Sequence, residues 1–209
     1  MMVPFSSDLY PTGDFTIEVW VNTLQNNWAE PALIDTTGGG GAQGYTITLD
    51  HRCGSGWTAC SYVKTDEGLF SVSGSASIND GSWHHVALVR NGSSLIQYID
   101  GTNVGSTPIS GTFSSPSSNI IAGTYNDGSG EGGTNSEWPL NGSIDEMRIS
   151  NTARDITSEC SSGCPRSLGS DGSTVAYWKF NEGSGDTTAD RSGHSHTGAL
   201  RNSPTWIMP

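Results

Sequence analysis

The most reactive side chains in the sequence are four cysteines, which form two local pairs. Cys53 lies close to Cys60, and Cys160 lies close to Cys164. Neither pair has the Cys-x2-Cys spacing of a zinc site, and no cysteine–histidine set has the spacing of a zinc finger. We therefore predict the disulfides Cys53–Cys60 and Cys160–Cys164, with free thiols as the alternative. Two disulfides indicate an oxidising compartment.

Two pairs of histidines could also do chemistry. His84 and His85 are adjacent within a strand-like segment, so only one of them can face a core. His194 and His196 form a His-x-His pattern, which is a feature of some transition-metal sites. No third histidine or cysteine follows nearby, so we expect no transition metal there.

Aromatic residues in loops are candidates for binding sugars, because a flat apolar ring can stack on a sugar ring beside polar groups that bond hydroxyls. Trp20, Trp83 and Trp178 lie within strand patterns and are expected in the core. The candidates for a glycan-binding surface lie in loop-like sequence and are Trp28, Trp57, Tyr125, Asn126 and Trp138. A structural plug beneath a loop is the alternative for each of them.

The composition argues against several classes of function. The 209 residues include 28 glycines and 9 prolines, which favours short strands joined by turns. A net charge of −12 repels phosphate backbones and argues against nucleic-acid binding. No apolar run approaches the ~20 residues that a membrane span needs. The start, Met1 to Pro4, lacks the pattern of a signal peptide, so we expect this chain to come from a longer secreted protein.

Alternating apolar residues predict an antiparallel sandwich of short strands. In residues 15–21 and 45–49 every second residue is apolar, which is typical of half-buried strands. Asn91-Gly92 and Asp100-Gly101 are hairpin dipeptides that divide residues 83–105 into three strands. Further strands are predicted at 120–122, 143–149 and 175–180, and a short helical turn within 152–160. The pattern predicts an all-β, antiparallel fold.

Several segments together resemble the laminin-G-like (LamG) jelly-roll domains of the concanavalin A-like lectin/glucanase superfamily. They are Gly13–Val21, Trp83–Arg90, Tyr98–Gly101, Leu140–Ile149 with Asn151–Arg154, and Ala176–Gly185 with Ala189–Gly193. Each is a weak signal alone, but together they extend over nearly the whole chain. The resemblance implies a jelly-roll β-sandwich and a structural role for the strand that holds His84 and His85.

The last of these segments lies outside its usual place. In many LamG-like proteins the counterpart of Tyr177–Gly185 precedes the counterpart of Phe15–Val21. A detached strand carrying Trp178 and Phe180 would expose a large apolar patch. We therefore expect one laminin-G-like domain over residues 1–209, with residues 175–209 folding back to complete the sandwich. A second, truncated domain is the alternative.

Enzymes also share this fold, so the fold does not decide the function. Retaining glycoside hydrolases of this shape carry a Glu-x-Asp-x-x-Glu strand, and the sequence contains no Glu-x-Asp. Alginate-lyase-like proteins carry a Gln-x-His strand, which is also missing, and Tyr177–Lys179 matches only a fragment of their second motif. Gly54–Gly56 matches part of a nucleophile elbow, but inside a cysteine loop. We predict no catalytic residue.

The resemblance further implies a structural calcium ion, which in laminin-G-like jelly rolls commonly joins the ends of the domain. Hard cations bind oxygen ligands that loops supply. The implied metal ligands are the carboxylates of Asp145 and Asp190 and the backbone oxygen of His196. The alternative for Asp190 is an Asx-turn, in which its carboxylate accepts bonds from nearby backbone N–H groups.

These features favour a secreted, non-catalytic binding module whose partner is a polysaccharide or another glycan, stabilised by calcium. The alternative is a module for protein interaction or adhesion that binds an extracellular protein. A polysaccharide-active enzyme of the same fold is the third hypothesis. The identity of the glycan and the oligomeric state stay open.

Overall fold

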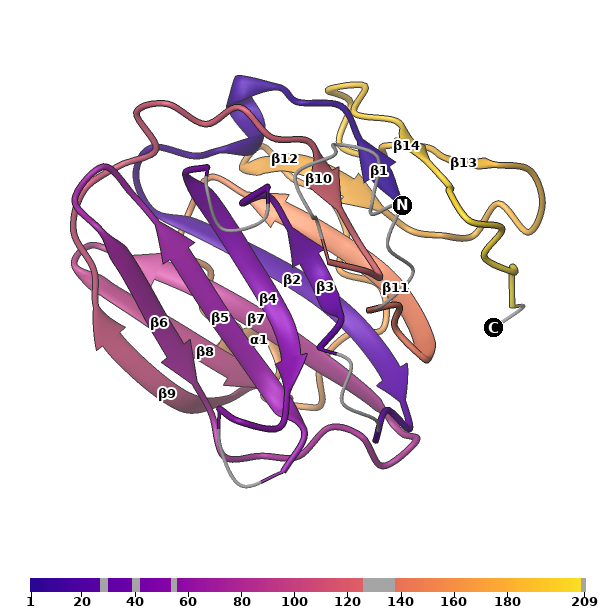
Figure 1. The fold of residues 1–209 in the computed structure, drawn as a ribbon, viewed down its shortest axis with the longest axis horizontal. Helices are drawn as coiled ribbons and strands as arrows, with labels where there is room; N and C mark the ends of the chain where they lie inside the picture. The colour runs from indigo at the N-terminus through magenta and orange to yellow at the C-terminus, as the bar shows by residue number, and fades with distance from the viewer. Residues whose placement is uncertain (27–29, 39–41, 54–55, 126–137, 208–209) are drawn as a thin grey trace.

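Two antiparallel sheets pack face to face in the computed structural model, which describes residues 1–26, 30–38, 42–53, 56–125 and 138–207 (Figure 1). In sheet order, the eight-stranded sheet contains β13 (Thr187–Thr188), β14 (Gly198–Ala199), β1 (Met2–Val3), β10 (Ile120–Ile121), β3 (Ala32–Asp35), β4 (Gly44–Asp50), β5 (Thr58–Lys64) and β6 (Leu69–Ser73). The six-stranded sheet contains β12 (Thr174–Trp178), β11 (Gly142–Ser150), β2 (Phe15–Thr23), β7 (Trp83–Asn91), β8 (Ser94–Ile99) and β9 (Thr102–Pro108). The predicted all-β jelly-roll sandwich is confirmed.

The core lies between the sheets and follows the predicted alternation. Phe15 and Ile17 of β2 and Tyr45 and Ile47 of β4 are fully buried in one apolar cluster. Phe113, from the connection after β9, joins them, with its ring centroid 5.9 Å from that of Phe15 and 6.2 Å from that of Tyr45. Large side chains that interlock in this way supply most of the apolar surface buried on folding.

The hairpins that join β7, β8 and β9 form where the sequence predicts them. Gly92 has a φ of 58°, and Asp100 and Gly101 have φ values of 49° and 80°. These are left-handed conformations, which match the twist of the flanking strands in a tight hairpin. Gly101 is also tightly packed, because an added Cβ would lie 2.4 Å from the Cβ of Cys160.

Six strands were not predicted, namely β1, β3, β5, β6, β13 and β14. All four residues of β3 are buried, so no polar residue alternates with the apolar ones. Strand β5 consists mainly of small and polar residues that are nevertheless buried. Periodicity identifies strands that have one solvent-exposed face, and β3 and β5 lack that contrast between their two faces.

The C-terminal segment contributes strands to both sheets. Strand β12 pairs with β11, and β14 pairs with both β13 and β1. Trp178 at the end of β12 is fully buried, and its indole Nε1 donates to the backbone oxygen of His196 at 2.6 Å. Figure 1 shows both chain termini on the same side of the sandwich, where β1, β13 and β14 lie.

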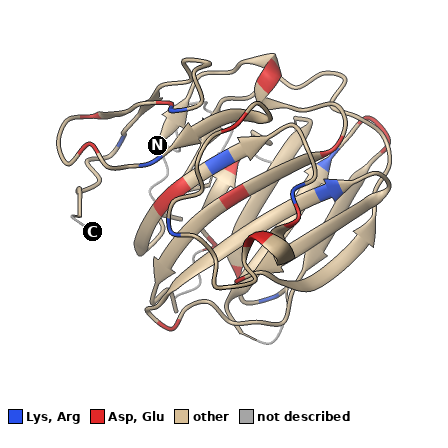
Figure 2. Ribbon diagram, turned by 180° about the vertical axis from the view of Figure 1, so that it is seen from behind, with Lys and Arg blue, Asp and Glu red and all other residues tan. Residues whose placement is uncertain are grey.

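Residues 151–172 cover the outer face of the six-stranded sheet, where charged side chains are buried. Glu18 of β2 is 0% exposed and Arg148 of β11 is 3% exposed. Arg148 donates from Nε to Glu18 Oε2 at 2.8 Å, and its Nη2 lies 2.6 Å from the same oxygen. Figure 2 views this side and shows acidic and basic residues on neighbouring strands. Ile156, at the start of α1 (Ile156–Glu159), packs against buried apolar residues of β7.

Both predicted disulfides are present. Cys53 is bonded to Cys60 beside the β4–β5 connection, and Cys160 is bonded to Cys164 within the covering segment. The Sγ atom of Cys160 lies 3.9 Å from Nδ1 of His85, which is itself buried on the outer face of the sheet. The second disulfide therefore lies directly above the buried charges.

Removing residues after Gly172 should leave the protein unable to fold. The deletion removes β12, β13 and β14, exposes the edge of β11 and deprives the core of Trp178. Exposure of an unpaired strand edge together with core residues favours aggregation. Solubility and thermal melting of the truncated chain measure the effect. A soluble truncation that melts cooperatively would show that residues 175–209 are dispensable for the sandwich.

Replacing Glu18 with alanine should lower the free energy of unfolding by about 3–5 kcal/mol, because it leaves the buried guanidinium of Arg148 without its main partner. Urea unfolding at pH 7 measures this cost. Glu67→Ala is the matched control, since Glu67 is exposed, and its effect should stay within about 0.5 kcal/mol. Equal costs for the two variants would contradict the central role of the buried pair.

Candidate functional site

A cleft of about 1200 Å³ opens between the C-terminal segment and the start of β11. One side is formed by Leu200–Ile207 and the other by Pro139–Asp145. Met1, Met2 and the residues from Ile121 to Thr124 also line it. The cleft therefore depends on segments from both ends of the chain, which the pairing of β14 with β1 brings together.

Three aromatic side chains line this cleft: Trp83, Phe180 and Trp206. Trp83 begins β7 and is half-buried. Phe180 follows β12, and its φ of 54° turns the chain out of the strand direction. Trp206 is held by its indole Nε1, which donates to the backbone oxygen of Gly185 at 2.9 Å. Asn141, Asn181 and Asn202 line the same cleft.

An arginine lies over two indole rings at the cleft wall. The Cζ atom of Arg166 is 4.5 Å from the ring centroid of Trp20 and 4.4 Å from that of Trp83. The Trp20 Nε1 donates to the backbone oxygen of Pro165 at 3.1 Å and so fixes the chain next to Arg166. Cation–π contacts of this kind favour one orientation of the guanidinium.

Two acidic residues of β11 lie behind this arginine. Asp145 Oδ2 lies 3.4 Å from Nη2 of Arg166. Burial raises the pKa of Asp145, and the neighbouring Glu146 raises it further, so that the pKa lies above its usual value despite the nearby arginine. Glu146 is buried and accepts hydrogen bonds from the Leu168 N–H at 2.9 Å and from the Tyr177 hydroxyl. These bonds fasten the segment that carries Arg166 to the sheet.

The predicted ligand residues that the structure describes, Trp57, Tyr125 and Trp138, are not among these lining residues. Tyr125 and Trp138 are each half-buried beside it, since their neighbours Thr124 and Pro139 line the cleft. Trp57 packs against the core with its ring 5.0 Å from that of His51 and does not line the cleft. Two further predicted residues, Trp28 and Asn126, lie outside the described residues.

Sequence reasoning missed the residues that do line the cleft. Trp83 was expected in the core because it belongs to a strand, but it stands at the strand's end. Trp206 follows a polar segment near the C-terminus, and a lone aromatic in such sequence was the signal available for it. Arg166 had no local signal, because two distant strands supply the rings beneath it.

Comparison with known proteins identifies the family. A profile of the concanavalin A-like lectin/glucanases superfamily matches residues 2–157. The chain belongs to this superfamily. No curated protein matches this sequence significantly.

Solved structures share the fold of this concanavalin A-like chain at low sequence identity. A candidate carbohydrate-binding protein from Bacteroides ovatus has a TM-score of 0.65 and 17% identity, over 97% of this chain and 58% of its own. Domains LG4-5 of the mouse laminin α1 chain have a TM-score of 0.56 and 13% identity, over 75% and 40%. The CBM40 of a Ruminococcus gnavus sialidase, bound to α2,3 sialyllactose, has a TM-score of 0.55 and 15% identity, over 72% and 83%. This chain thus spans little more than half of the Bacteroides protein and less than half of the laminin chain.

The hydrogen bonds of Asp190 do not fit the implied calcium ion. Its Oδ1 accepts from the N–H groups of Tyr177 at 3.0 Å and Ser192 at 2.8 Å. Its Oδ2 accepts from the Ser192 hydroxyl at 2.8 Å and the His196 N–H at 2.9 Å. The His196 carbonyl already accepts from Trp178. These donors use the lone pairs that a cation would need, and they form the Asx-turn alternative.

Three other clusters bring potential metal ligands within 4.8 Å in the described part of the chain. They are His85 with Cys160 and Cys164, Asp50 with Cys53 and Cys60, and Glu30 with Asp50 and His51. The first two contain oxidised cysteines, which are not thiolate ligands. In the third, both carboxylates are bound to the guanidinium of Arg52. None of the three includes Asp145, Asp190 or His196.

The histidines serve structural contacts. His85 is the buried member of its pair, and its Nε2 lies 3.2 Å from Oε1 of Glu18. His84 bridges Asp100 at 2.7 Å and Asp80 at 3.1 Å. Burial lowers the pKa of His84, but the two carboxylates outweigh it and raise the pKa above its usual value. His196 lies 2.9 Å from Asp8 and joins the C-terminal segment to the N-terminal 3-10 helix η1 (Ser7–Leu9).

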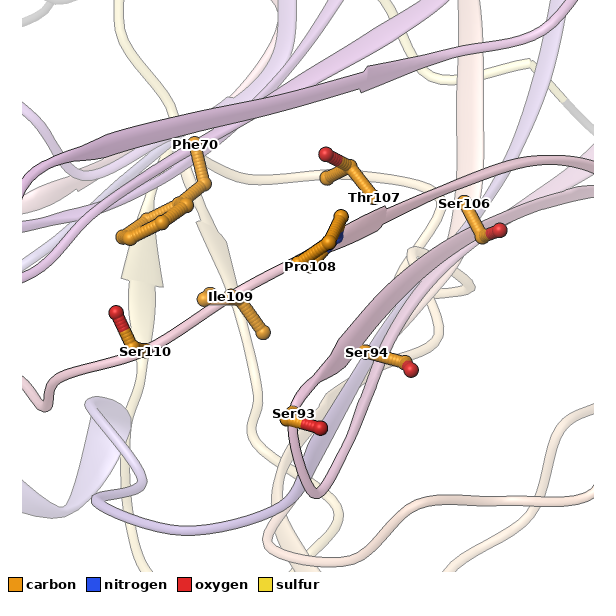
Figure 3. Close-up of a pocket in the computed structure, with 8 residues that line it drawn as sticks. All are labelled: Phe70, Ser93, Ser94, Ser106, Thr107, Pro108, Ile109 and Ser110. Carbon is orange, nitrogen blue, oxygen red and sulfur yellow. The ribbon is translucent and has the colours of Figure 1, made fainter.

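A second depression of about 380 Å³ lies at the edge formed by β6 and β9 (Figure 3). Phe70 of β6 faces residues Ser106–Ser110, and Ser93 and Ser94 complete the lining. Phe70 and Ile109 belong to the apolar core contacts, so they offer little free apolar surface. The depression has no charged lining residue, and it is about a third of the volume of the cleft.

Replacing Asp190 with asparagine should destabilise the protein without any change in bound metal. Burial raises the pKa of Asp190, but the N–H donors outweigh it and lower the pKa below its usual value. The stabilisation is therefore present above the pKa of the unfolded chain, about 4, and is lost as the pH falls through the folded pKa. We expect a cost of about 1–3 kcal/mol at pH 7 that diminishes below pH 4, measured by urea unfolding.

A chelator provides the control for the conclusion that Asp190 stabilises a turn and does not bind calcium. The melting temperature should be the same with and without chelator in the wild-type protein. A fall that added calcium reverses would show a bound ion that the contacts of Asp190 do not account for.

Proposed function

We propose that this chain is a non-catalytic module of an extracellular protein and that it binds a glycan in the cleft between the C-terminal segment and β11. One observation carries the proposal: three aromatic residues and three asparagines line one cleft. Sugar rings present apolar C–H faces and hydroxyl edges, so a site for them needs both kinds of group.

The charged groups of the cleft could also bind sugar hydroxyls. The carboxylate of Asp145 accepts hydrogen bonds, whereas the guanidinium of Arg166 only donates them. Such a pair, 3.4 Å apart, can engage two neighbouring hydroxyls of one sugar. Since Trp20 and Trp83 hold the arginine, little side-chain entropy is lost when a ligand binds.

The comparisons and the disulfides support the proposal that the chain is a binding module of an extracellular protein. The solved structures that share the fold include a candidate carbohydrate-binding protein from Bacteroides, a Ruminococcus CBM40 bound to sialyllactose, and two domains of a mouse laminin chain. Two disulfides are suited to an oxidising compartment. No helix in the described part of the chain is long and apolar enough to cross a membrane.

Replacing Trp83 or Trp206 with alanine should weaken glycan binding at least fivefold each, a cost of about 1 kcal/mol. Trp206→Ala removes an aromatic ring from the cleft, and Trp83→Ala removes a ring that holds Arg166. The ligand is first found by affinity electrophoresis on a panel of soluble polysaccharides, and titration calorimetry then measures the dissociation constants. Trp57→Ala is the control, since Trp57 does not line the cleft.

The Trp57→Ala control also distinguishes the cleft from the glycan-binding surface that the sequence predicts. Loss of binding in Trp57→Ala, with Trp83→Ala unaffected, would place the ligand beside Trp57, outside the cleft. Absence of binding to every polysaccharide, in a folded wild-type protein, would favour the protein-interaction hypothesis.

A further inference from the structure

We infer that Arg166 forms a carboxylate-binding subsite within the cleft, so that the preferred ligand is an acidic glycan containing uronic acid residues. The inference rests on the proposed function and adds the chemical class of the ligand. It derives from the geometry of one arginine and from the distribution of charge around it.

The guanidinium of Arg166 is fixed but poorly satisfied. Its Cζ atom lies 4.5 Å from the ring centroid of Trp20 and 4.4 Å from that of Trp83. Its side chain is nevertheless 47% exposed. The single hydrogen bond it makes to the described residues, to Asp145, is 3.4 Å long, beyond the usual range for N–H···O.

Other arginines of the chain have guanidinium groups with close hydrogen-bond acceptors. Arg154 donates to both oxygens of Asp171, at 2.9 and 2.8 Å. Arg148 donates to Glu18 and to the backbone oxygen of Leu168. Arg166 lacks such a bidentate partner in the described structure, and a planar carboxylate matches the fork that it presents.

The charge of the cleft differs from the charge of the protein. The whole chain has 21 acidic residues and 9 lysines and arginines. Among the described residues that line the cleft there are two arginines, Arg166 and Arg201, and one acid, Asp145. A cleft of this composition attracts an anion locally, although the rest of the surface repels it.

The covering segment fixes the position of Arg166 before any ligand arrives. The disulfide Cys160–Cys164 ends two residues before it, and Trp20 holds the intervening Pro165. The Leu168 N–H donates to Glu146 on the other side. A ligand carboxylate would take the N–H groups of Arg166 that Asp145 does not use. Prior fixation lowers the entropic cost of that contact.

The test compares a uronic acid oligosaccharide with the same oligosaccharide after its carboxyl groups are reduced to primary alcohols. Titration calorimetry at low salt should show roughly 10- to 100-fold tighter binding of the acidic form by the wild-type protein. Arg166→Gln should remove this preference, and Arg166→Lys should keep only a small part of it, since an ammonium lacks the planar fork. Arg191→Gln is the matched control, because Arg191 is 55% exposed and does not line the cleft.

The outcomes distinguish this inference from the proposed function. Equal affinity for the acidic and the reduced oligosaccharide would overturn the carboxylate subsite and leave glycan binding intact. A preference that survives in Arg166→Gln, with the melting temperature unchanged, would overturn it as well. Failure of both ligands and of the polysaccharide panel would instead reject the proposed function. Loss of the preference in Arg191→Gln would show that general surface charge is responsible.

Discussion

The buried ion pair of Glu18 and Arg148 organises the outer side of the six-stranded sheet. Both charges are almost fully removed from water, which costs several kcal/mol per ion unless partners surround them. Residues 151–172 supply those partners, since the Leu168 carbonyl accepts from Arg148 and the carboxylate of Glu159 lies 3.2 Å from its Nη2. Burial raises the pKa of Glu18, but His85 and Arg148 outweigh it and lower the pKa, so the carboxylate stays ionised. The sheet and its cover are therefore stable only together.

The shape of the cleft also depends on the contacts between the sheet and residues 151–172. The covering segment carries the Cys160–Cys164 disulfide and then Arg166, and its position is set by the same contacts that satisfy the buried charges. On the opposite side, the C-terminal segment carries Trp206 and is held through Asp190, His196 and the pairing of β14 with β1. A ligand in the cleft would touch both segments. Binding should consequently stabilise the fold by mass action.

The sandwich carries the cleft on chain segments at its edge. The strands supply Trp83 and Asp145, whereas residues 200–207 have no regular secondary structure. Solved structures share this fold at 13–17% identity, so the fold does not by itself decide what a chain binds. Under the proposed function, the cleft would set the specificity of this chain.

The sequence by itself determined the sandwich, the three-stranded meander and both disulfides, because each depends on local chemistry. Alternation along Phe15–Val21, left-handed turns at Asn91-Gly92 and Asp100-Gly101, and short cysteine loops all act between near neighbours. Strands β3 and β5 escaped prediction because burial on both faces removes the alternation. Only the tertiary structure decided that Asp190 closes a turn through four donors, and that Arg166 lies over Trp20 and Trp83 beside Asp145. Those contacts join residues that are far apart in the sequence. The local sequence around each residue does not specify its partners, because the packing of the two sheets brings them together.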